Sequence, residues 1–156
     1  MEKAPQPDRA VLERWLKEAR IEFELCPHCE GLHLQPLRGL EGVIDCRLFV
    51  ERYGLLLTTE LEVRPMAVLP LSADMGRLNM DYPMLKVFMD IADDSVPQLV
   101  MAGVYPSAGG VSQEQFAAFV ALTLEETRQL AAACLQLDYL FAEPEGNRTS
   151  SSPALH

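Results

Sequence analysis

One long apolar helix face constrains the fold of this chain more than any other feature. Ser112 and Gln115 have the spacing of a capping box, which marks the start of a helix. The residues behind it that recur three or four positions apart are Phe116, Phe119, Val120, Thr123, Thr127, Leu130, Cys134 and Leu137. A helix over 112–137 with such a face must bury it, and a β-sheet is the surface that we expect to cover.

Apolar and polar residues alternate in segments that predict this sheet. The expected strands cover 21–25, 32–35, 43–50, 55–63, 84–92 and 98–105. The residues expected on the buried face of the third, fourth and fifth strands are Ile44, Cys46, Leu48 and Val50, then Leu55, Leu57, Leu61 and Val63, then Leu85, Val87, Met89 and Ile91. Short turns between most of the strands indicate antiparallel pairing.

Two further helices complete the predicted order. Asp8 is a plausible N-cap for a helix over 9–20, and a weaker helix over 66–78 tolerates Pro70 because that residue falls near its first turn. The order of helix, four strands, helix, two strands and helix predicts an α+β domain over 9–141. We expect residues 1–8 to be flexible and the polar tail 142–156 to be disordered.

Charge and composition exclude several classes of function. The 156 residues carry a net charge of −10, which disfavours binding to nucleic acid or to a membrane surface. The first residues lack the apolar core of a signal peptide, so we expect a cytoplasmic protein whose four cysteines stay reduced. No nucleophile and base can be paired from the sequence, and we expect no catalytic residues.

The segment CPHCEGLHL, residues 26–34, is the one motif with evident chemistry, and three interpretations compete for it. Cys26, Cys29 and His33 are candidate zinc ligands, with His28 nearby, although the second ligand pair of a common structural zinc site is missing. A redox pair is a second interpretation, but such a pair normally begins a helix. The pattern favours the third, a hairpin turn with cysteines packed at its ends, and therefore no cofactor.

Four segments resemble the YbjN family, the bacterial sensory transduction regulators: CPHCEGLHL, EVRPMAVLPLSAD, DDSVPQLV and GVSQEQFAAFV. The resemblance covers about residues 10–140. It implies a curved antiparallel sheet with three flanking helices, similar in fold to type III secretion chaperones. It also implies a bacterial role in regulating motility, surface polysaccharide and stress responses. It transfers no reaction and no catalytic residue.

The expected function is that of a non-enzymatic regulator that binds another protein in a chaperone-like manner. The candidate binding residues are Met66, Leu71, Met75 and Met80, because thioether side chains adapt to varied partners. The helix that carries them has more apolar residues than one sheet face needs, which predicts a homodimer; the partner protein itself is unknown. The alternative is a small zinc- or redox-responsive sensor that uses Cys26 and Cys29.

Overall fold

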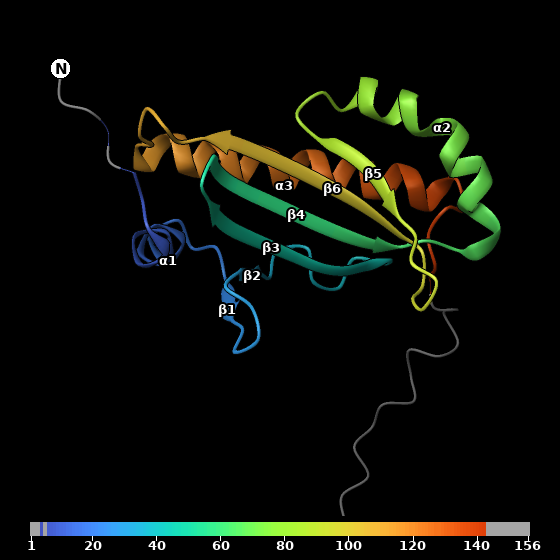
Figure 1. Cartoon of the computed structure of the whole chain (residues 1–156), viewed down its shortest axis with the longest axis horizontal. Coiled ribbons are helices and arrows are strands. Elements are labelled where there is room, and N and C mark those ends of the chain that lie inside the picture. Colours follow the sequence, from blue (N-terminus) through green and yellow to red (C-terminus); the bar gives the residue numbers. More distant parts are fainter. Residues whose placement is uncertain (1–3, 5, 143–156) are drawn as a thin grey trace, which may run out of the picture.

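The fold is a six-stranded antiparallel sheet with helices packed along it (Figure 1). The computed structural model describes residue 4 and residues 6–142. The elements in chain order are α1 (Arg9–Glu18), β1 (Phe23–Leu25), β2 (Leu32–Leu34), β3 (Val43–Glu51), β4 (Gly54–Glu62), η1 (Pro65–Ala67), α2 (Val68–Asp81), β5 (Lys86–Asp90), β6 (Gln98–Pro106) and α3 (Gln113–Gln136). The predicted order and the α+β class are confirmed.

The strands lie in the order β1-β2-β3-β4-β6-β5, and every neighbouring pair is antiparallel. The first four strands follow one another as hairpins. Helix α2 connects β4 to β5, which is not its neighbour, and β6 then fills the place between them. Strands β5 and β1 therefore form the two edges of the sheet. The long central strands β3, β4 and β6 therefore form the platform on which the rest of the molecule is built.

Helix α3 runs along one face of this platform and joins two core clusters (Figure 1). Phe116, Phe119 and Val120 pack with α1 and with β2 to β4, whereas Leu130 and Cys134 pack with α2, β5 and β6. The capping box is present: the Ser112 hydroxyl accepts from the Gln115 N–H at 3.1 Å, and Gln115 Oε1 accepts from the Ser112 N–H at 3.0 Å. None of the described helices is long and apolar enough to span a lipid bilayer.

The α1 half of the core begins before the helix itself. Asp8 caps α1 by accepting a hydrogen bond from the Val11 N–H at 2.9 Å, as expected. Trp15 lies against Phe116, with ring centroids 5.5 Å apart. Pro7 is buried and the Gln6 side chain donates to the Ala108 carbonyl, so the ordered fold includes residues that we expected to be flexible. Residues 143–156 of the expected tail 142–156 lie outside the described residues.

Four residues that were predicted to face inward are in fact exposed, each for a local reason. Ile44 lies at a register shift between Val43 and Asp45, which turns it outward and leaves Val43 to pack against both core clusters. Val50 comes near the end of β3, and Ile91 lies beyond the end of β5. Leu137, expected on the buried face of α3, is also exposed because it is the C-cap residue.

Helix α2 covers the edge of β5, and the Asn79 side chain makes the two backbone hydrogen bonds that a neighbouring strand would make there. Asn79 Nδ2 donates to the Val87 carbonyl at 3.0 Å, and the Val87 N–H donates to Asn79 Oδ1 at 2.9 Å. Asn79 Nδ2 also donates to the Met75 carbonyl of its own helix at 3.0 Å. These bonds satisfy backbone groups that an edge strand would otherwise offer to another chain.

We therefore predict that Asn79→Ala lowers the free energy of unfolding by about 1–3 kcal/mol, because it leaves half-buried backbone groups without partners. Ser72→Ala is the matched control on the same helix, since the Ser72 hydroxyl bonds only its own helix at Val68. It should change stability by less than about 0.5 kcal/mol. Urea unfolding measures both, and equal stability of the two variants would refute the edge-capping role of Asn79.

Candidate functional site

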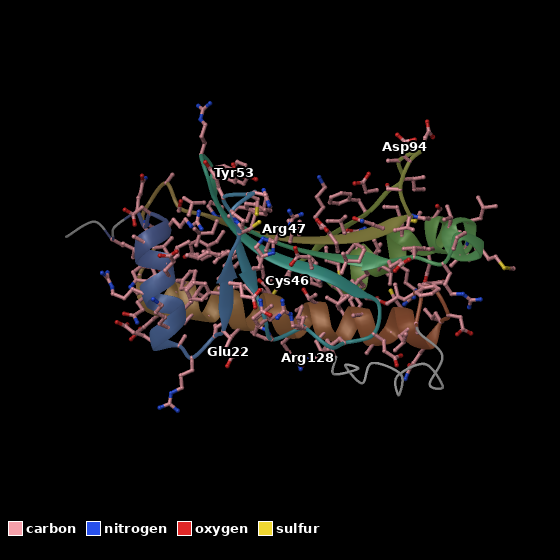
Figure 2. All side chains as sticks on the ribbon, turned by 90° about the horizontal axis from the view of Figure 1, so that it is seen from below. Glu22, Cys46, Arg47, Tyr53, Asp94 and Arg128 are labelled. Carbon is pink, nitrogen blue, oxygen red and sulfur yellow. The ribbon has the colours of Figure 1, made fainter. Side chains whose placement is uncertain are left out.

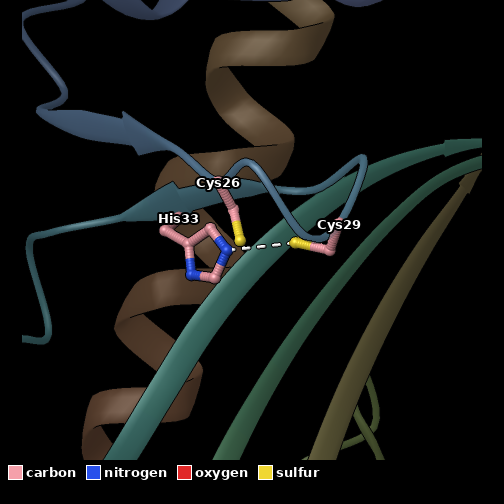
Figure 3. A group of neighbouring side chains, drawn as sticks. All are labelled: Cys26, Cys29 and His33. Atoms are coloured by element: carbon pink, nitrogen blue, oxygen red, sulfur yellow. Dashed lines mark hydrogen bonds between the residues drawn. The ribbon is translucent and has the colours of Figure 1, made fainter.

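The β1–β2 hairpin brings together the three candidate ligands of the cysteine motif (Figure 3). Cys26 directly follows β1, Cys29 lies in the turn, and His33 is the middle residue of β2. The Sγ atoms of the two cysteines and a ring nitrogen of His33 all lie within 4.8 Å of one another. Cys29 Sγ is 3.2 Å from His33 Nε2. The antiparallel pairing of β1 with β2 confirms the predicted hairpin, and its turn also brings the three candidate ligands together.

His33 points away from the core because its neighbours in β2 point into it. Leu32 and Leu34 are buried in the α1 half of the core, so the alternation of the strand places His33 on the opposite face. Cys46 and Arg47 repeat this alternation on β3, and Figure 2 shows Cys46 on the α3 side of the sheet and Arg47 on the other. The candidate site therefore belongs to the sheet face opposite α3.

A carboxylate on β3 fixes the orientation of the His33 ring. His33 Nδ1 lies 2.9 Å from Asp45 Oδ2 and 3.1 Å from Oδ1. A carboxylate only accepts hydrogen bonds, so Nδ1 carries the proton and Nε2 is left free to accept. Asp45 itself accepts from the Cys46 N–H at 2.8 Å. Sequence reasoning did not single out Asp45, because its contact with His33 depends on the pairing of β2 with β3.

Arg47 continues this chain of polar contacts across the sheet. Its guanidinium pairs with Glu60 on β4, lies 3.8 Å from Asp45 and stacks over the Phe49 ring at 5.4 Å from the centroid. Phe49 in turn lies under the turn that carries Cys29: a Cβ built at Gly31 would come within 2.7 Å of the Phe49 ring. A Cβ at residue 31 would push the Phe49 ring aside, so the absence of a side chain at Gly31 lets the turn pack directly on Phe49.

Three of the four cysteines have a thiol pKa that their surroundings shift, one downward and two upward. The hydrogen bond from the His28 backbone N–H, followed by the contacts with the side chains of Cys29 and His33, lowers the pKa of the Cys26 thiol from 9.0 to about 7. Burial raises the pKa of Cys46 to about 11 and that of Cys134 to about 12. Cys46 and Cys134 are core residues, as predicted, and cannot act as thiolates near neutral pH.

The structure separates the predicted protein-binding residues from one another. Met66 and Met80 are exposed and Met75 is half-buried, but Leu71 is fully buried against α3 and β6. Leu71 is therefore corrected from a binding residue to a core residue: it lies on the side of α2 that faces the sheet. Leu69, which sequence reasoning missed, is among the most exposed apolar residues, and its helical phase relative to Met80 was the available signal.

We predict that Cys26 reacts with iodoacetamide with a pH midpoint near 7, because its thiolate is stabilised by nearby hydrogen bonds. The reaction should slow as the pH falls below that midpoint, since the thiol form is a poor nucleophile. Mass spectrometry of the Cys26 peptide at a series of pH values measures this. Cys29→Ala is expected to move the midpoint upward because it removes one of these contacts, and an unshifted midpoint near 9 in the wild-type chain would contradict the prediction.

Comparison with known proteins places this chain in a family. Residues 8–136 match the model of the YbjN family, described as "Putative bacterial sensory transduction regulator". YbjN of Escherichia coli K12 and that of Shigella flexneri, both named as uncharacterized proteins, are each 36% identical to this chain over 120 residues, which is 77% of this chain and 76% of theirs.

Solved structures agree with this assignment. The crystal structure of E. coli YbjN, titled "a putative transcription regulator", superposes with a TM-score of 0.87 at 31% identity, covering 90% of this chain and 99% of that one. An uncharacterized protein from Methanothermobacter thermautotrophicus has a TM-score of 0.53 at 8% identity, covering 83% and 98%, and is similar in fold alone. On the family match, the identity and the shared fold together, this chain belongs to the YbjN family.

Proposed function

We propose that this protein is a non-enzymatic regulator that acts by binding another protein through an apolar stripe on α2. Among the described residues, the three most exposed large apolar side chains all lie on η1 and α2: Met66 at 86%, Leu69 at 81% and Met80 at 74%. Contiguous exposed apolar patches of this kind are typical of surfaces that bind other proteins. This concentration on one short segment is the observation that carries the proposal.

The exposed residues share one side of the helix. Leu69, Ala73, Gly76 and Met80 follow one another at intervals of four, three and four residues, which places them in one line along the helix, and Met66 extends that line by one turn. All five are exposed, and together we call them the α2 stripe. The buried Leu71 and Leu78 hold the opposite side of α2 against the core.

The shape of the α2 stripe suits another helix. Its centre consists of Ala73 and Gly76, and a Cβ built at Gly76 would meet nothing within 4 Å. The larger apolar side chains lie at both ends of the stripe. A helix of the partner could therefore approach closely at the middle and pack against these side chains at either end. Along one flank, Arg77 pairs with Asp74 at 2.6 Å and with Asp81 at 2.9 Å, which supplies a charged rim.

The family and the sequence support a regulator rather than an enzyme. The family description names a regulator and no reaction. We also propose that the protein works in the cytoplasm, where its four free cysteines would stay reduced. The regulation of motility, surface polysaccharide and stress responses, and the likeness to type III secretion chaperones, are carried over from the family resemblance as part of this proposal.

The free protein is proposed to be a homodimer that pairs through the same stripe. In a two-fold pair of antiparallel α2 helices, Ala73 and Gly76 of both copies meet at the axis, and Leu69 of each copy approaches Met80 of the other. This arrangement covers exposed apolar surface on both chains at once. A partner helix would then compete with the second copy for the stripe.

We predict that light scattering at micromolar concentration gives twice the chain mass of 17.4 kDa for the wild type. Leu69→Asp with Met80→Asp should give the single-chain mass, because each substitution places a carboxylate in the proposed contact. Circular dichroism must show that the variant is folded. A monomeric wild type would refute the dimer, and a dimeric variant would move the dimer contact away from α2.

A second prediction addresses the partner protein. Wild-type protein and the Leu69→Asp, Met80→Asp variant are used as baits in the same bacterial lysate, and bound proteins are identified by mass spectrometry. The matched control is Phe88→Asp, an equally drastic change at an exposed apolar residue on β5. We expect the stripe variant to lose the specific partner and the control to retain it. The reverse pattern would show that the sheet, not α2, is the binding surface.

A further inference from the structure

Three soft metal ligands converge at the β1–β2 hairpin, and the proposed protein-binding function leaves them unused. We infer that this hairpin binds one Zn²⁺ through Cys26 Sγ, Cys29 Sγ and His33 Nε2, with the fourth coordination position open to solvent. This inference does not rest on the α2 stripe, which belongs to the other half of the core.

The spacing of the three atoms suits a tetrahedral ion. Zinc–sulfur and zinc–nitrogen bonds of about 2.3 Å and 2.0–2.1 Å at tetrahedral angles place ligand atoms roughly 3.5–3.8 Å apart. Here Cys29 Sγ and His33 Nε2 are 3.2 Å apart, and all three ligand atoms lie within 4.8 Å of one another. The side chains therefore need only small adjustments to close around an ion, and Figure 3 shows them pointing toward one another.

The surroundings of His33 are those of a metal ligand. Ligating histidines commonly donate their second ring N–H to a carboxylate, which fixes the tautomer and raises the basicity of the ligating nitrogen. His33 Nδ1 makes this contact with Asp45 at 2.9–3.1 Å, so Nε2 is the nitrogen directed at the cysteines. The Cys46 N–H donates to the Asp45 carboxylate and fixes its position on β3. Asp45 is therefore a positioning residue for His33.

The turn itself is arranged to hold two thiolates. The His28 N–H points at Cys26 Sγ, 3.3 Å away, and such a donor favours a negatively charged sulfur. Gly31 allows the turn to rest on Phe49, which is itself covered by Arg47. The ligands therefore lie on a supported turn rather than on a free loop, and little ordering is needed when the ion binds.

The donor set selects the class of ion. Thiolate sulfur and imidazole nitrogen suit Zn²⁺, whereas Mg²⁺ and Ca²⁺ require oxygen ligands. Within the described part of the chain, the cluster holds three ligands, and His28 is exposed and lies outside it. Two thiolates and one imidazole with a free position form the kind of open site that accepts water or another exchangeable donor.

The first experiment measures binding to the full chain, reduced with a phosphine and stripped of metal. Zinc is titrated in competition with a chromophoric chelator, and Co²⁺ is then used as a spectroscopic substitute. We expect one zinc per chain and the strong visible bands of tetrahedral thiolate-bound cobalt. Cys26→Ser, Cys29→Ser and His33→Ala should each weaken zinc binding by more than about 100-fold. That is the upper end of the effect expected when a residue that only hydrogen-bonds to a ligand is removed. Glu30→Gln, in the same turn, is the matched control and should bind like the wild type.

Two further variants test the details of the site. Asp45→Asn keeps an oxygen for the Cys46 N–H but removes the charge beside His33, so we expect one zinc per chain at about 10–100-fold lower affinity. His28→Ala should leave the affinity unchanged if the fourth position is open. A loss as large as that of His33→Ala would instead make His28 the fourth ligand and overturn the open position.

The inference fails if the reduced wild-type chain takes up no zinc, or if uptake persists when Cys26, Cys29 and His33 are all replaced. A Cys26–Cys29 disulfide that forms in air, together with no zinc uptake by the reduced chain, would identify a redox pair instead. Circular dichroism and melting without metal confirm that each variant folds. None of these outcomes depends on the oligomeric state or on the capture of a partner, so failure here is distinguishable from failure of the α2 proposal.

Discussion

Burial of one face of α3 against the central strands is the interaction on which the rest of the structure depends. The helix is long enough to touch both core clusters, and each cluster is closed by a different peripheral helix, α1 in one and α2 in the other. The contact is also close, because a Cβ built at Gly103 on β6 would come within 2.8 Å of Thr123 on α3. The absence of a side chain at Gly103 thus sets how near the helix lies to the sheet.

This contact decides which residues remain available for chemistry. Because α3 occupies one face, every second residue of β2, β3 and β4 is committed to the core. His33, Asp45 and Arg47 fall on the alternate positions, and cross-strand pairing gathers them beside the cysteine turn. Cys46, one residue away from Asp45, falls on the committed face, where burial keeps it protonated. Strand alternation thus accounts for the inert Cys46, whereas Cys26 and Cys29 lie in the turn between β1 and β2, outside the strands.

Much of the fold was predictable from sequence because its signals are local. The capping box and the apolar period located α3 almost to the residue, and the alternation in 55–63 placed Leu55, Leu57, Leu61 and Val63 correctly. Ile44 was misplaced because a bulge shifts the register without leaving a mark in the alternation.

The errors at the candidate sites have the same physical origin. The contact between His33 and Asp45 depends on strand pairing between residues far apart in the chain, which no local pattern encodes. Leu71 was assigned to the surface because apolar character alone does not reveal which side of a helix faces the core. The line through Leu69, Ala73, Gly76 and Met80 could have been found from helical phase, had small residues been counted as part of an apolar face.

The two proposed sites occupy opposite ends of the molecule and depend on different parts of the core. The cysteine–histidine cluster stands on the half closed by α1, whereas the α2 stripe is held by Leu71 and Leu78 in the half closed by α2. Among the described residues, α3, the central strands and the shared neighbour Val43 connect the halves. Coupling between the sites would require a second arrangement of these shared elements, and the structure describes one arrangement. The two sites are therefore expected to act as independent features of one scaffold, each able to be removed without disturbing the other.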